Sequence, residues 1–379
     1  MSFCREWFPA PDDYPENRLF SLDLLRGLDM LFLTVIVPLV YGAQKTFGCF
    51  PGSVMGQLTH NWLGFTLYDI IMPLFIFMCG AAIPFALGHR LKEGKSAFLR
   101  HVLARVVLLW SLGGCVQGNW LSLDPQTFSP FANTLQAIAI GYLATALMMM
   151  VPNRVFHIVL PVFLAGLYGV LLGCDFTETD NLAQRIDHAF LSAILPAGNP
   201  YVAVPSCYTW VLTSMMFAAM TMCGYHATGL LRGSGSPGRK LGGLLACGAI
   251  LLGVGRMAAI WIPVAKPVYS LSFTLMAMGW CVLLLSVCYL LTDIWRFRRG
   301  TALLLLFGQF ALTAYIVRKL FDVVLVKSAC VLGSGLDRLL QGGGEQGLVI
   351  QLIVAVELIV AVAVWRRLKT SRRGGTSPD

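Results

Sequence analysis

The chain has 379 residues, of which 57% are hydrophobic and only 12% are charged, and its mean hydropathy is +0.72. A soluble domain of this size carries more charge and less apolar surface, so these values exclude that class. The net charge of +9 does not indicate a nucleic-acid partner, because Lys and Arg gather in alternate loops, as the topology of a membrane protein requires.

Apolar stretches of about 18 or more residues recur along the chain, and each can cross a bilayer core of ~30 Å. Their continuity favours helices over the short alternating strands of a membrane barrel. We therefore predict an all-α, polytopic transmembrane helical bundle of about ten spans. The expected spans cover residues 20–42, 64–88, 98–117, 133–151, 155–173, 207–230, 240–262, 268–291, 302–320 and 347–366.

The segments between these spans alternate in charge. Basic residues gather in 89–105, 152–154, 231–240, 292–300 and the C-terminal tail. The intervening segments are poor in bases, acidic or balanced, and cover 43–63, 118–132, 174–206 and 321–346. The positive-inside rule then places both termini in the cytoplasm. We predict a cytoplasmic segment over residues 1–19, a single membrane domain over 20–366 and a basic cytoplasmic tail over 367–379.

The first span begins SLDLLRGLDM and holds Asp23, Arg26 and Asp29 at positions i, i+3 and i+6. That spacing puts the three charges on an arc of roughly 120° of one helix. Charges within a span are costly and usually face the bundle interior or a wet cavity. Two interpretations stay open: a self-neutralising cluster that fixes helix packing, or the polar wall of a site.

The second span follows the stretch THNWLGFTLYD, in which His60 lies in the preceding loop and Asp69 lies near the start of the helix. Thr66 and Asp69 have the spacing of a capping box, with Thr66 as N-cap and Asp69 at N3. A loop histidine beside a carboxylate at the buried edge of a helix is also the usual composition of an oriented general base. His60 and Asp69 are therefore candidate catalytic residues, and a solvated histidine next to a structural cap is the alternative.

Later spans hold isolated polar side chains, namely Gln136, Arg256, Gln309 and Glu357. Taken alone, none of the four residues indicates its role. Glu357 either lines an interior cavity or pairs with Arg256. The cysteines show no CxxC spacing and no zinc pattern, so no metal site is expected.

Five distinctive segments follow one another along the chain: SLDLLRGLDM, HNWLGFTLYDIIMPLFIFMCGAAIPFAL, NTLQAIAIGY, IPVAKPVYSLSFTLMAMGWCVLLL and FGQFALTAYIV. Together and in this order they resemble the heparan-α-glucosaminide N-acetyltransferase family. The resemblance spans nearly the whole chain and is closest to bacterial members of largely unassigned function.

The resemblance implies a transmembrane acyltransferase that moves an acetyl (acyl) group from cytosolic acyl-CoA to a sugar or glycan acceptor on the outer side. Acetyl-CoA would act as a co-substrate, with no bound cofactor. The family's catalytic histidine precedes a W-x-G-x-T block, which implies that role for His60, with Asp69 orienting it. Membrane lipid, acyl-CoA and the acceptor are the expected partners, a homo-oligomer is left open, and the bacterial inner membrane is the expected location.

The phosphates of the acyl donor would need basic groups, and the first basic inner loop offers Arg90, Lys92, Arg100 and Arg105. The positive-inside rule explains the same residues without a ligand. The substrate-binding or polar interior is assigned to Asp23, Arg26, Asp29, Asn61, Trp62, Gln136 and Gln309.

Two other functions are kept as alternatives. A transporter of a small polar solute would use the intramembrane charges as a path, but neither inverted repeats nor paired broken helices are visible in the sequence. A catalytically silent membrane protein of the same fold is the other. His60 stands two residues before Trp62 where the family has three, and Val37 or Pro38 stands where an asparagine is common.

Overall fold

The computed structural model describes residues 7–9, 14, 18–131, 133–173, 175–178, 180–196, 198–203, 208–340 and 343–374. Within these ranges the chain is helical and contains no strand, which confirms the predicted all-α class. The predicted segment 1–19 lies mostly outside the described residues, as do the last five residues of the predicted tail.

All ten predicted spans contain a helix, and seven of these helices are long and apolar enough to cross a membrane. The seven are Phe20–Phe47, Leu67–Ala86, Lys95–Gln117, Arg154–Leu172, Pro237–Ala258, Leu271–Ile294 and Leu348–Thr370. These helices are compatible with a multi-pass membrane protein. The predicted count of ten spans and the predicted cytoplasmic side of the termini stay predictions.

Three of the predicted spans differ from an ordinary membrane helix. Helix α7 (Thr134–Met149) has only 16 residues. Helix α11 (Ser214–Arg232) is not among the seven; it packs against α5, α7, α8 and α12 and is largely buried by protein, which tolerates its polar residues. The segment predicted over 302–320 is broken into α14 (Ala302–Gln309) and α15 (Ala311–Leu320), which are bent by 77°.

The sequence predicts a continuous span over 302–320, so the bend is a difference from that prediction. Phe310 separates the two halves and has φ −118° and ψ 29°, outside the helical region. Gly308 lies two residues earlier and is a poor helix former.

The chain divides into two compact units, Met1–Leu58 with Cys288–Asp379 (unit 1) and Thr59–Val287 (unit 2). In unit 1 the structure describes α2 (Phe20–Leu31), a π-helical turn (Phe32–Ile36), α3 (Val37–Phe47), α4 (Gly52–Gly56), a second π-helical turn (Leu290–Ile294), α14, α15, α16 (Asp322–Leu339), a 3₁₀ turn (Gly344–Gln346) and α17 (Leu348–Gly374).

Unit 1 is held together by close helix pairs. Helix α2 packs on α14 where both carry glycine. A Cβ on Gly27 would collide with the carbonyl of Leu304, and one on Gly308 would collide with the carbonyl of Asp23. Small residues of this kind let the backbones of membrane helices approach closely. Helix α17 packs on α3 and α16.

Unit 2 contains the helices that carry the candidate site. They are a 3₁₀ turn (Leu67–Ile70), α5 (Ile71–Ala86), a 3₁₀ turn (Arg90–Glu93), α6 (Lys95–Gln117), a 3₁₀ turn (Trp120–Ser122), α7, α8 (Arg154–Leu172), α9 (Leu182–Ile194), α10 (Pro200–Ala203), α11, α12 (Pro237–Ala258) and α13 (Leu271–Tyr289), whose last two residues belong to unit 1.

Two segments predicted as links between spans contain long helices, of 13 and 18 residues. Helix α9 lies within 174–206, and α16 lies within 321–346. The start of α9 follows from its sequence, because Asn181 and Gln184 form a capping box. Its apolar residues then repeat at helical spacing, a pattern that is too short for a span but sufficient for a surface helix.

Helices α5, α7 and α11 form the centre of unit 2. They approach closely through glycines: a Cβ on Gly80 would meet the Thr221 carbonyl, and one on Gly224 would meet the Phe77 carbonyl. This packing fixes the position of α5, and the 3₁₀ turn that leads directly into α5 carries Asp69.

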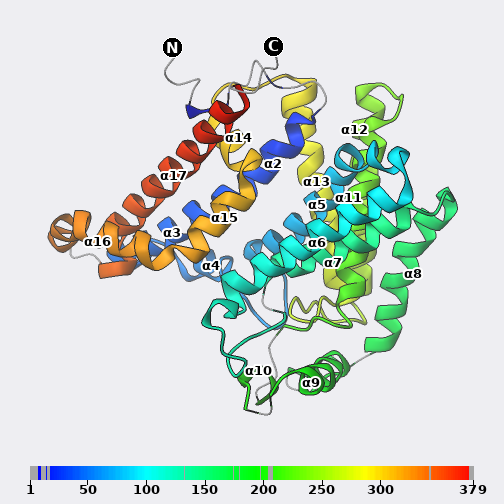
Figure 1. Ribbon diagram of the computed structural model, residues 1–379, viewed down its shortest axis with the longest axis horizontal. Coiled ribbons are helices and arrows are strands. Elements are labelled where there is room, and N and C mark those ends of the chain that lie inside the picture. The colour runs from blue at the N-terminus through cyan, green and yellow to red at the C-terminus, as the bar shows by residue number, and fades with distance from the viewer. Residues whose placement is uncertain are drawn as a thin grey trace. The chain divides into compact units, whose positions relative to one another are not determined.

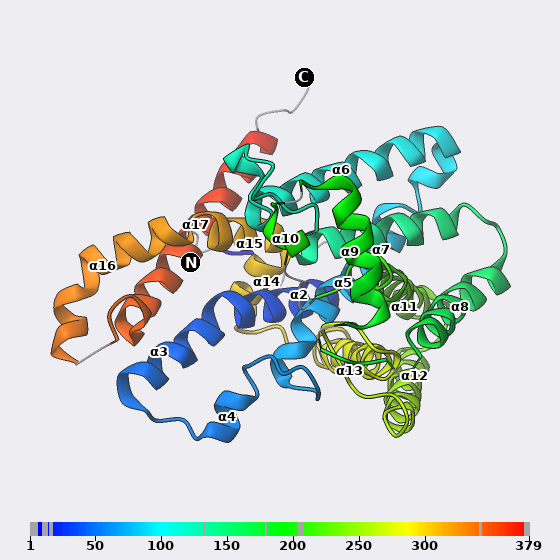
Figure 2. The same cartoon turned by 90° about the horizontal axis from the view of Figure 1, so that it is seen from below.

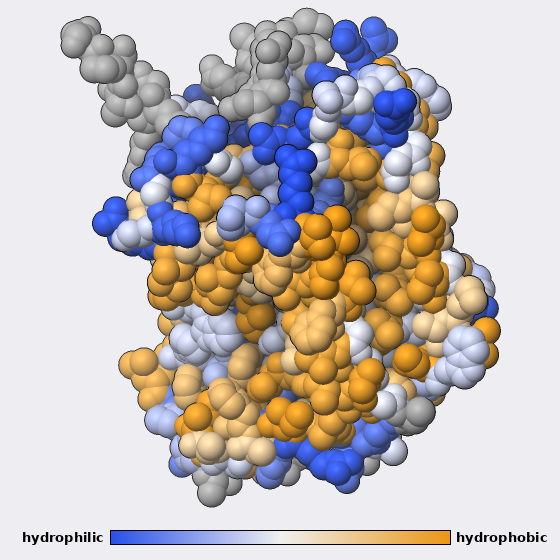
Figure 3. Space-filling model, turned by 90° about the vertical axis from the view of Figure 1, so that its right-hand side faces the viewer, coloured by the Kyte–Doolittle hydropathy of each residue, from blue (hydrophilic) through white to orange (hydrophobic). Residues whose placement is uncertain are grey.

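Helices α8 and α12 cover this centre and expose apolar side chains. Only 17% of each span's apolar window is buried, although the mean hydropathies are 2.3 and 1.7. Figure 3 shows a broad hydrophobic band on one face of the molecule, with hydrophilic residues at its two edges. Contiguous exposed apolar surface of this kind matches the environment of lipid tails.

Some helices of unit 2 run in opposite directions, so the start of one lies at the same end of the unit as the ends of others. The start of α5 and the ends of α8 and α12 lie at the lower end of this unit in Figure 1, together with α9 and α10. Figure 2 shows the same helices from below. This end collects the loops that build the candidate site.

Candidate active site

His60 and Asp69 are in contact. The Nδ1 atom of His60 lies 2.9 Å from Oδ1 of Asp69. The two side chains differ in exposure, since 41% of the His60 side chain is exposed and only 1% of the Asp69 side chain. A buried carboxylate therefore holds the inner nitrogen of an imidazole whose outer part is open to solvent.

The second oxygen of Asp69 is fixed by the predicted capping box. Oδ2 accepts hydrogen bonds from the backbone N–H of Thr66 at 2.9 Å and from its hydroxyl at 2.8 Å. The capping interactions are present in both directions, which confirms the prediction for Thr66 and Asp69. The helix start thus orients the carboxylate, leaving Oδ1 for His60.

A third ionisable group, Lys266, completes the cluster. Its Nζ lies 3.2 Å from Oδ1 of Asp69 and 3.1 Å from Nδ1 of His60. Only 4% of the Lys266 side chain is exposed. Lys266 and Asp69 form a buried ion pair, and His60 lies at its solvent side.

One assignment of the imidazole proton satisfies Asp69, and in it the 3.1 Å approach of Lys266 Nζ to Nδ1 of His60 is a contact between two donors and not a hydrogen bond. Oδ1 of Asp69 accepts from both the ammonium of Lys266 and the Nδ1–H of His60. This tautomer leaves Nε2 of His60 without a proton and free to act as a base or nucleophile. The ammonium and the Nδ1–H are then neighbours that share one acceptor.

The loop between α12 and α13 holds Lys266 by its own hydrogen bonds. The hydroxyl of Ser270 accepts from the backbone N–H of Ala265 at 3.0 Å, and that of Ser272 donates to the carbonyl of Pro263 at 3.0 Å. These residues belong to the segment IPVAKPVYSLSF. The segment that supports the family resemblance therefore builds the third member of the site.

Two further contacts fix this loop in unit 2. The N–H of Gly64, four residues after His60, donates to the carbonyl of Val264 at 2.8 Å. Tyr269 is fully buried and has φ +46°, a left-handed conformation that is unusual for a bulky residue. Its N–H donates to the carbonyl of Lys266 at 2.9 Å, so the strained turn closes directly around the lysine.

Aromatic rings surround the imidazole. The ring of Tyr68 lies 4.6 Å from that of His60, and the ring of Tyr208 lies 6.4 Å away in an edge-on arrangement. Lys266 Nζ lies 5.9 Å from the Tyr68 ring centre, within cation–π range. These rings restrict the orientation of the histidine and cover the ion pair.

Burial lowers the pKa of Lys266 from 10.5 to about 8, and the neighbouring Asp69 carboxylate opposes part of that shift. The lysine is still mostly protonated at neutral pH. A perturbed lysine next to a carboxylate and a histidine is typical of a functional site, although buried structural ion pairs also perturb pKa values.

The two residues that follow His60 differ in their exposure to solvent. Asn61 is exposed, whereas Trp62 is partly buried and its indole N–H donates to the carbonyl of Phe176 at 3.2 Å. Trp62 thus ties the histidine loop to the segment before α9.

The four predicted donor-binding residues lie on the turn after α5 and on α6. Arg90, Lys92 and Arg100 are exposed, and the guanidinium of Arg105 lies 4.8 Å from the ring centre of Tyr142. The structure brings none of these four into hydrogen-bond contact with His60, Asp69 or Lys266, so a role for them concerns a separate part of unit 2.

The charges of the first span lie in unit 1. Asp23 and Arg26 form an ion pair at 2.9 Å. Asp29 is 2% exposed, and its Oδ2 has no hydrogen-bond partner among the described residues. Since no contact joins Asp29 to Arg26, the expected arrangement in which two acids flank one base is found for Asp23 alone.

The remaining polar candidates have local roles. Gln136 is fully buried and forms a capping box with Asn133 at the start of α7. Gln309 is the last residue of α14, at the bend before α15. Glu357 accepts a hydrogen bond from Ser328 at 2.8 Å, while Arg256 is exposed on α12.

Lys266 is the member of the site that sequence reasoning missed. It lies 206 residues from His60, so local spacing gives no sign of the contact. The sequence does show one unusual feature, because Lys266 is an isolated lysine between Pro263 and Pro267 in a short link between two predicted spans.

No group of three or more His, Cys, Asp or Glu suited to a metal ion occurs among the described residues. No protein-family model matches the chain, and no curated protein is significantly similar to it.

Proposed function

We propose that the chain is an integral membrane acyltransferase, active in the bacterial inner membrane, that moves an acetyl group from acyl-CoA to a sugar or glycan acceptor. The observation that carries the proposal is the cluster of His60, Asp69 and Lys266, in which a buried carboxylate orients an exposed imidazole. The resemblance to the heparan-α-glucosaminide N-acetyltransferase family supplies the reaction class.

The chemistry assigned to His60 follows from its free Nε2 atom. In a direct transfer, Nε2 takes the proton of the acceptor hydroxyl or amine while that group attacks the thioester carbonyl. The C–S bond breaks, and the CoA thiolate takes the proton back from the imidazolium. In a two-step transfer, Nε2 itself attacks the carbonyl, the C–S bond breaks and CoA leaves as its thiolate. The acceptor then attacks the acyl-imidazolium, the C–N bond breaks and neutral His60 is regenerated, while the proton that the acceptor loses goes to the thiolate.

Asp69 and Lys266 act as positioning residues in both routes. Asp69 fixes the tautomer by accepting the Nδ1–H, as the aspartate of a Ser-His-Asp triad does. Lys266 compensates the buried charge of Asp69, since an unpaired carboxylate at that depth would be costly.

The experiment that tests the reaction uses the full chain in liposomes with labelled acetyl-CoA and a mixture of free glycans on the other side. The proposal expects the label to move to a glycan, with CoA released in equal amount. Acetyl-CoA that is never consumed, with any acceptor or with water, would contradict the proposal.

A transporter of a small polar solute is the second candidate, favoured by a specific feature of unit 1. The bent pair α14 and α15 is a discontinuous helix, and the buried Asp29 of the same unit has a carboxylate oxygen, Oδ2, with no hydrogen-bond partner among the described residues. Broken helices and intramembrane acids are common in transporters. Solute uptake into the same liposomes that is lost in Asp29→Asn, without acyl transfer, would favour this candidate.

A further inference from the structure

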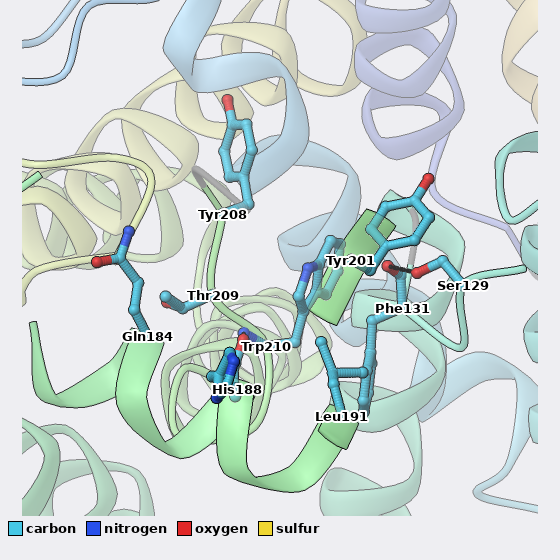
Figure 4. Close-up of a pocket in the computed structure, with 10 residues that line it drawn as sticks. Ser129, Phe131, Gln184, His188, Leu191, Tyr201, Tyr208, Thr209 and Trp210 are labelled. Carbon is cyan, nitrogen blue, oxygen red and sulfur yellow. Dashed lines mark hydrogen bonds between the residues drawn. The ribbon is translucent and has the colours of Figure 1, made fainter. Parts of the chain in front are cut away.

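A pocket beside the candidate active site is lined by three segments of unit 2. They are the turn at 129–131, helix α9, and Tyr201 with residues 208–210 before α11. Figure 4 shows side chains from all three segments around it. Of the residues that line it, Tyr208 also borders His60, and the others have no role in the cluster of His60, Asp69 and Lys266.

One wall of the pocket is aromatic. The rings of Phe131 and Trp210 are stacked at 6.0 Å with an interplanar angle of 17°. Tyr201 and Leu191 extend this apolar lining. Flat aromatic surface suits the apolar face of a pyranose ring, which carries C–H groups on one side and hydroxyls at its edge.

Three polar groups of the lining have hydrogen-bonding capacity left over. The indole N–H of Trp210, the imidazole of His188 and the hydroxyl of Tyr201 have no hydrogen-bond partner among the described residues. Asp187 differs, because its carboxylate accepts the backbone N–H groups of Trp210 at 2.6 Å and Val211 at 2.9 Å. Asp187 therefore shapes the wall, and the three free groups are available to ligand hydroxyls.

The charge of the lining excludes an anionic ligand. No Lys or Arg is among the described residues that line the pocket, whereas the carboxylate of Asp187 is. The nearby Arg185 is occupied by Asp175 and Asp180 at 3.0 and 3.5 Å. A sulfate, phosphate or uronate would find no counter-charge here and would face a buried acid.

The pocket is connected to the cluster by adjacent residues. In Figure 4 the ring of Tyr208 points away from Trp210, and it lies edge-on to His60. The N–H of Thr209 donates to the carbonyl of Pro267, the residue after Lys266, at 3.1 Å. A ligand in the pocket would therefore lie next to Tyr208, whose ring also contacts the imidazole of His60.

We propose that this pocket is the subsite for a neutral saccharide ring of the acceptor and that it rejects polyanionic glycans. The inference rests on the proposed acyl transfer for its biological meaning, and it makes a binding claim that can be tested without that reaction. The aromatic wall binds the face of the ring, and His188, Tyr201 and Trp210 bind its hydroxyls.

The test uses the full chain purified in detergent, without acyl-CoA. Saturation-transfer NMR measures binding of methyl β-D-glucoside, and methyl β-D-glucuronide serves as the matched anionic probe. The double variant Tyr201→Phe with His188→Ala removes two hydrogen-bonding groups from half-buried and exposed positions. Ser192→Ala is the control, because Ser192 is exposed on the same helix and does not line the pocket.

We expect the glucoside to bind, its Kd to rise about tenfold or more in the double variant through the loss of two hydrogen bonds, and Ser192→Ala to match wild type. The glucuronide should not compete. Absence of glucoside binding, a Kd unchanged in the double variant, or equal competition by the glucuronide would overturn the subsite. Sugar binding without acyl transfer would support the subsite and reject the proposed reaction. Acyl transfer that is unchanged in the double variant would support the reaction and reject the subsite.

Discussion

The loss of the Lys266 proton is expected to limit the activity of the candidate site at alkaline pH. Burial lowers its pKa to about 8, so the ammonium is lost as the pH rises through that value. The neutral amine no longer compensates the charge of Asp69, and the carboxylate that orients His60 loses the support of a cation.

Acyl transfer by wild type is therefore expected to decline above about pH 8. Lys266→Arg should move that decline to higher pH, because a guanidinium stays charged. Lys266→Met should lower turnover at every pH and remove the alkaline decline. The measurement is kcat against pH, with Lys240→Met as a control lysine remote in the chain. An identical alkaline decline in Lys266→Met would show that another group causes it.

The contact between His60 and Asp69 could be predicted from the sequence because it is local. The two residues are nine positions apart, and the capping box fixes where the carboxylate lies. Lys266 could not be predicted in the same way, since its contacts with His60 and Asp69 join segments that lie about 200 residues apart in the chain. A single sequence without such long-range information shows only an isolated lysine between prolines.

Among the helices, α11 packs most closely on α5 and so determines where the preceding 3₁₀ turn with Asp69 lies. Gly224 of α11 contacts the backbone of α5 so closely that a Cβ would meet the Phe77 carbonyl. Gly229 lies on the same helix and has no atom within 4 Å of an added Cβ. The two glycines form a matched pair in which only one is constrained by packing.

Gly224→Ala is expected to destabilise the protein by about 1–3 kcal/mol, because the helices must separate to admit the methyl group. Gly229→Ala should be neutral or stabilise by up to about 1 kcal/mol through better helix propensity. Thermal unfolding in detergent compares the two variants. Equal midpoints for both would mean that α5 and α11 do not approach as closely as the structure shows.

The positions of the helices were predicted more successfully than the form of each helix, that is, whether it is straight or bent and whether it faces lipid or protein. Continuous apolar runs locate helices reliably, because a bilayer selects for them. The run at 302–320 gives no warning of its bend, since Phe310 is as apolar as its neighbours and the break depends on packing within unit 1. Helix α11 likewise resembles a span in length, and only its burial by neighbouring helices explains its polar residues.

For the whole molecule, the orientation in the membrane remains a prediction from the distribution of charge. Basic loops predict that Lys95 faces the cytoplasm and that Asn61, next to His60, faces outward. In a cysteine-free background, Asn61→Cys should react with an impermeant reagent in intact cells, and Lys95→Cys only after permeabilisation. Reaction of both from the same side would reject the predicted topology.

His60→Ala is the most direct test of the proposal that His60 carries the chemistry of acyl transfer. Loss of a general base or nucleophile should lower turnover by about two orders of magnitude or more. Acetyl-CoA binding should survive, because the predicted donor-binding residues are not in contact with His60. Thr59→Ala, at the neighbouring position, should transfer normally. The decisive measurement is turnover in liposomes alongside acetyl-CoA binding for wild type and both variants: binding without transfer in His60→Ala supports the account, and full turnover in that variant contradicts it.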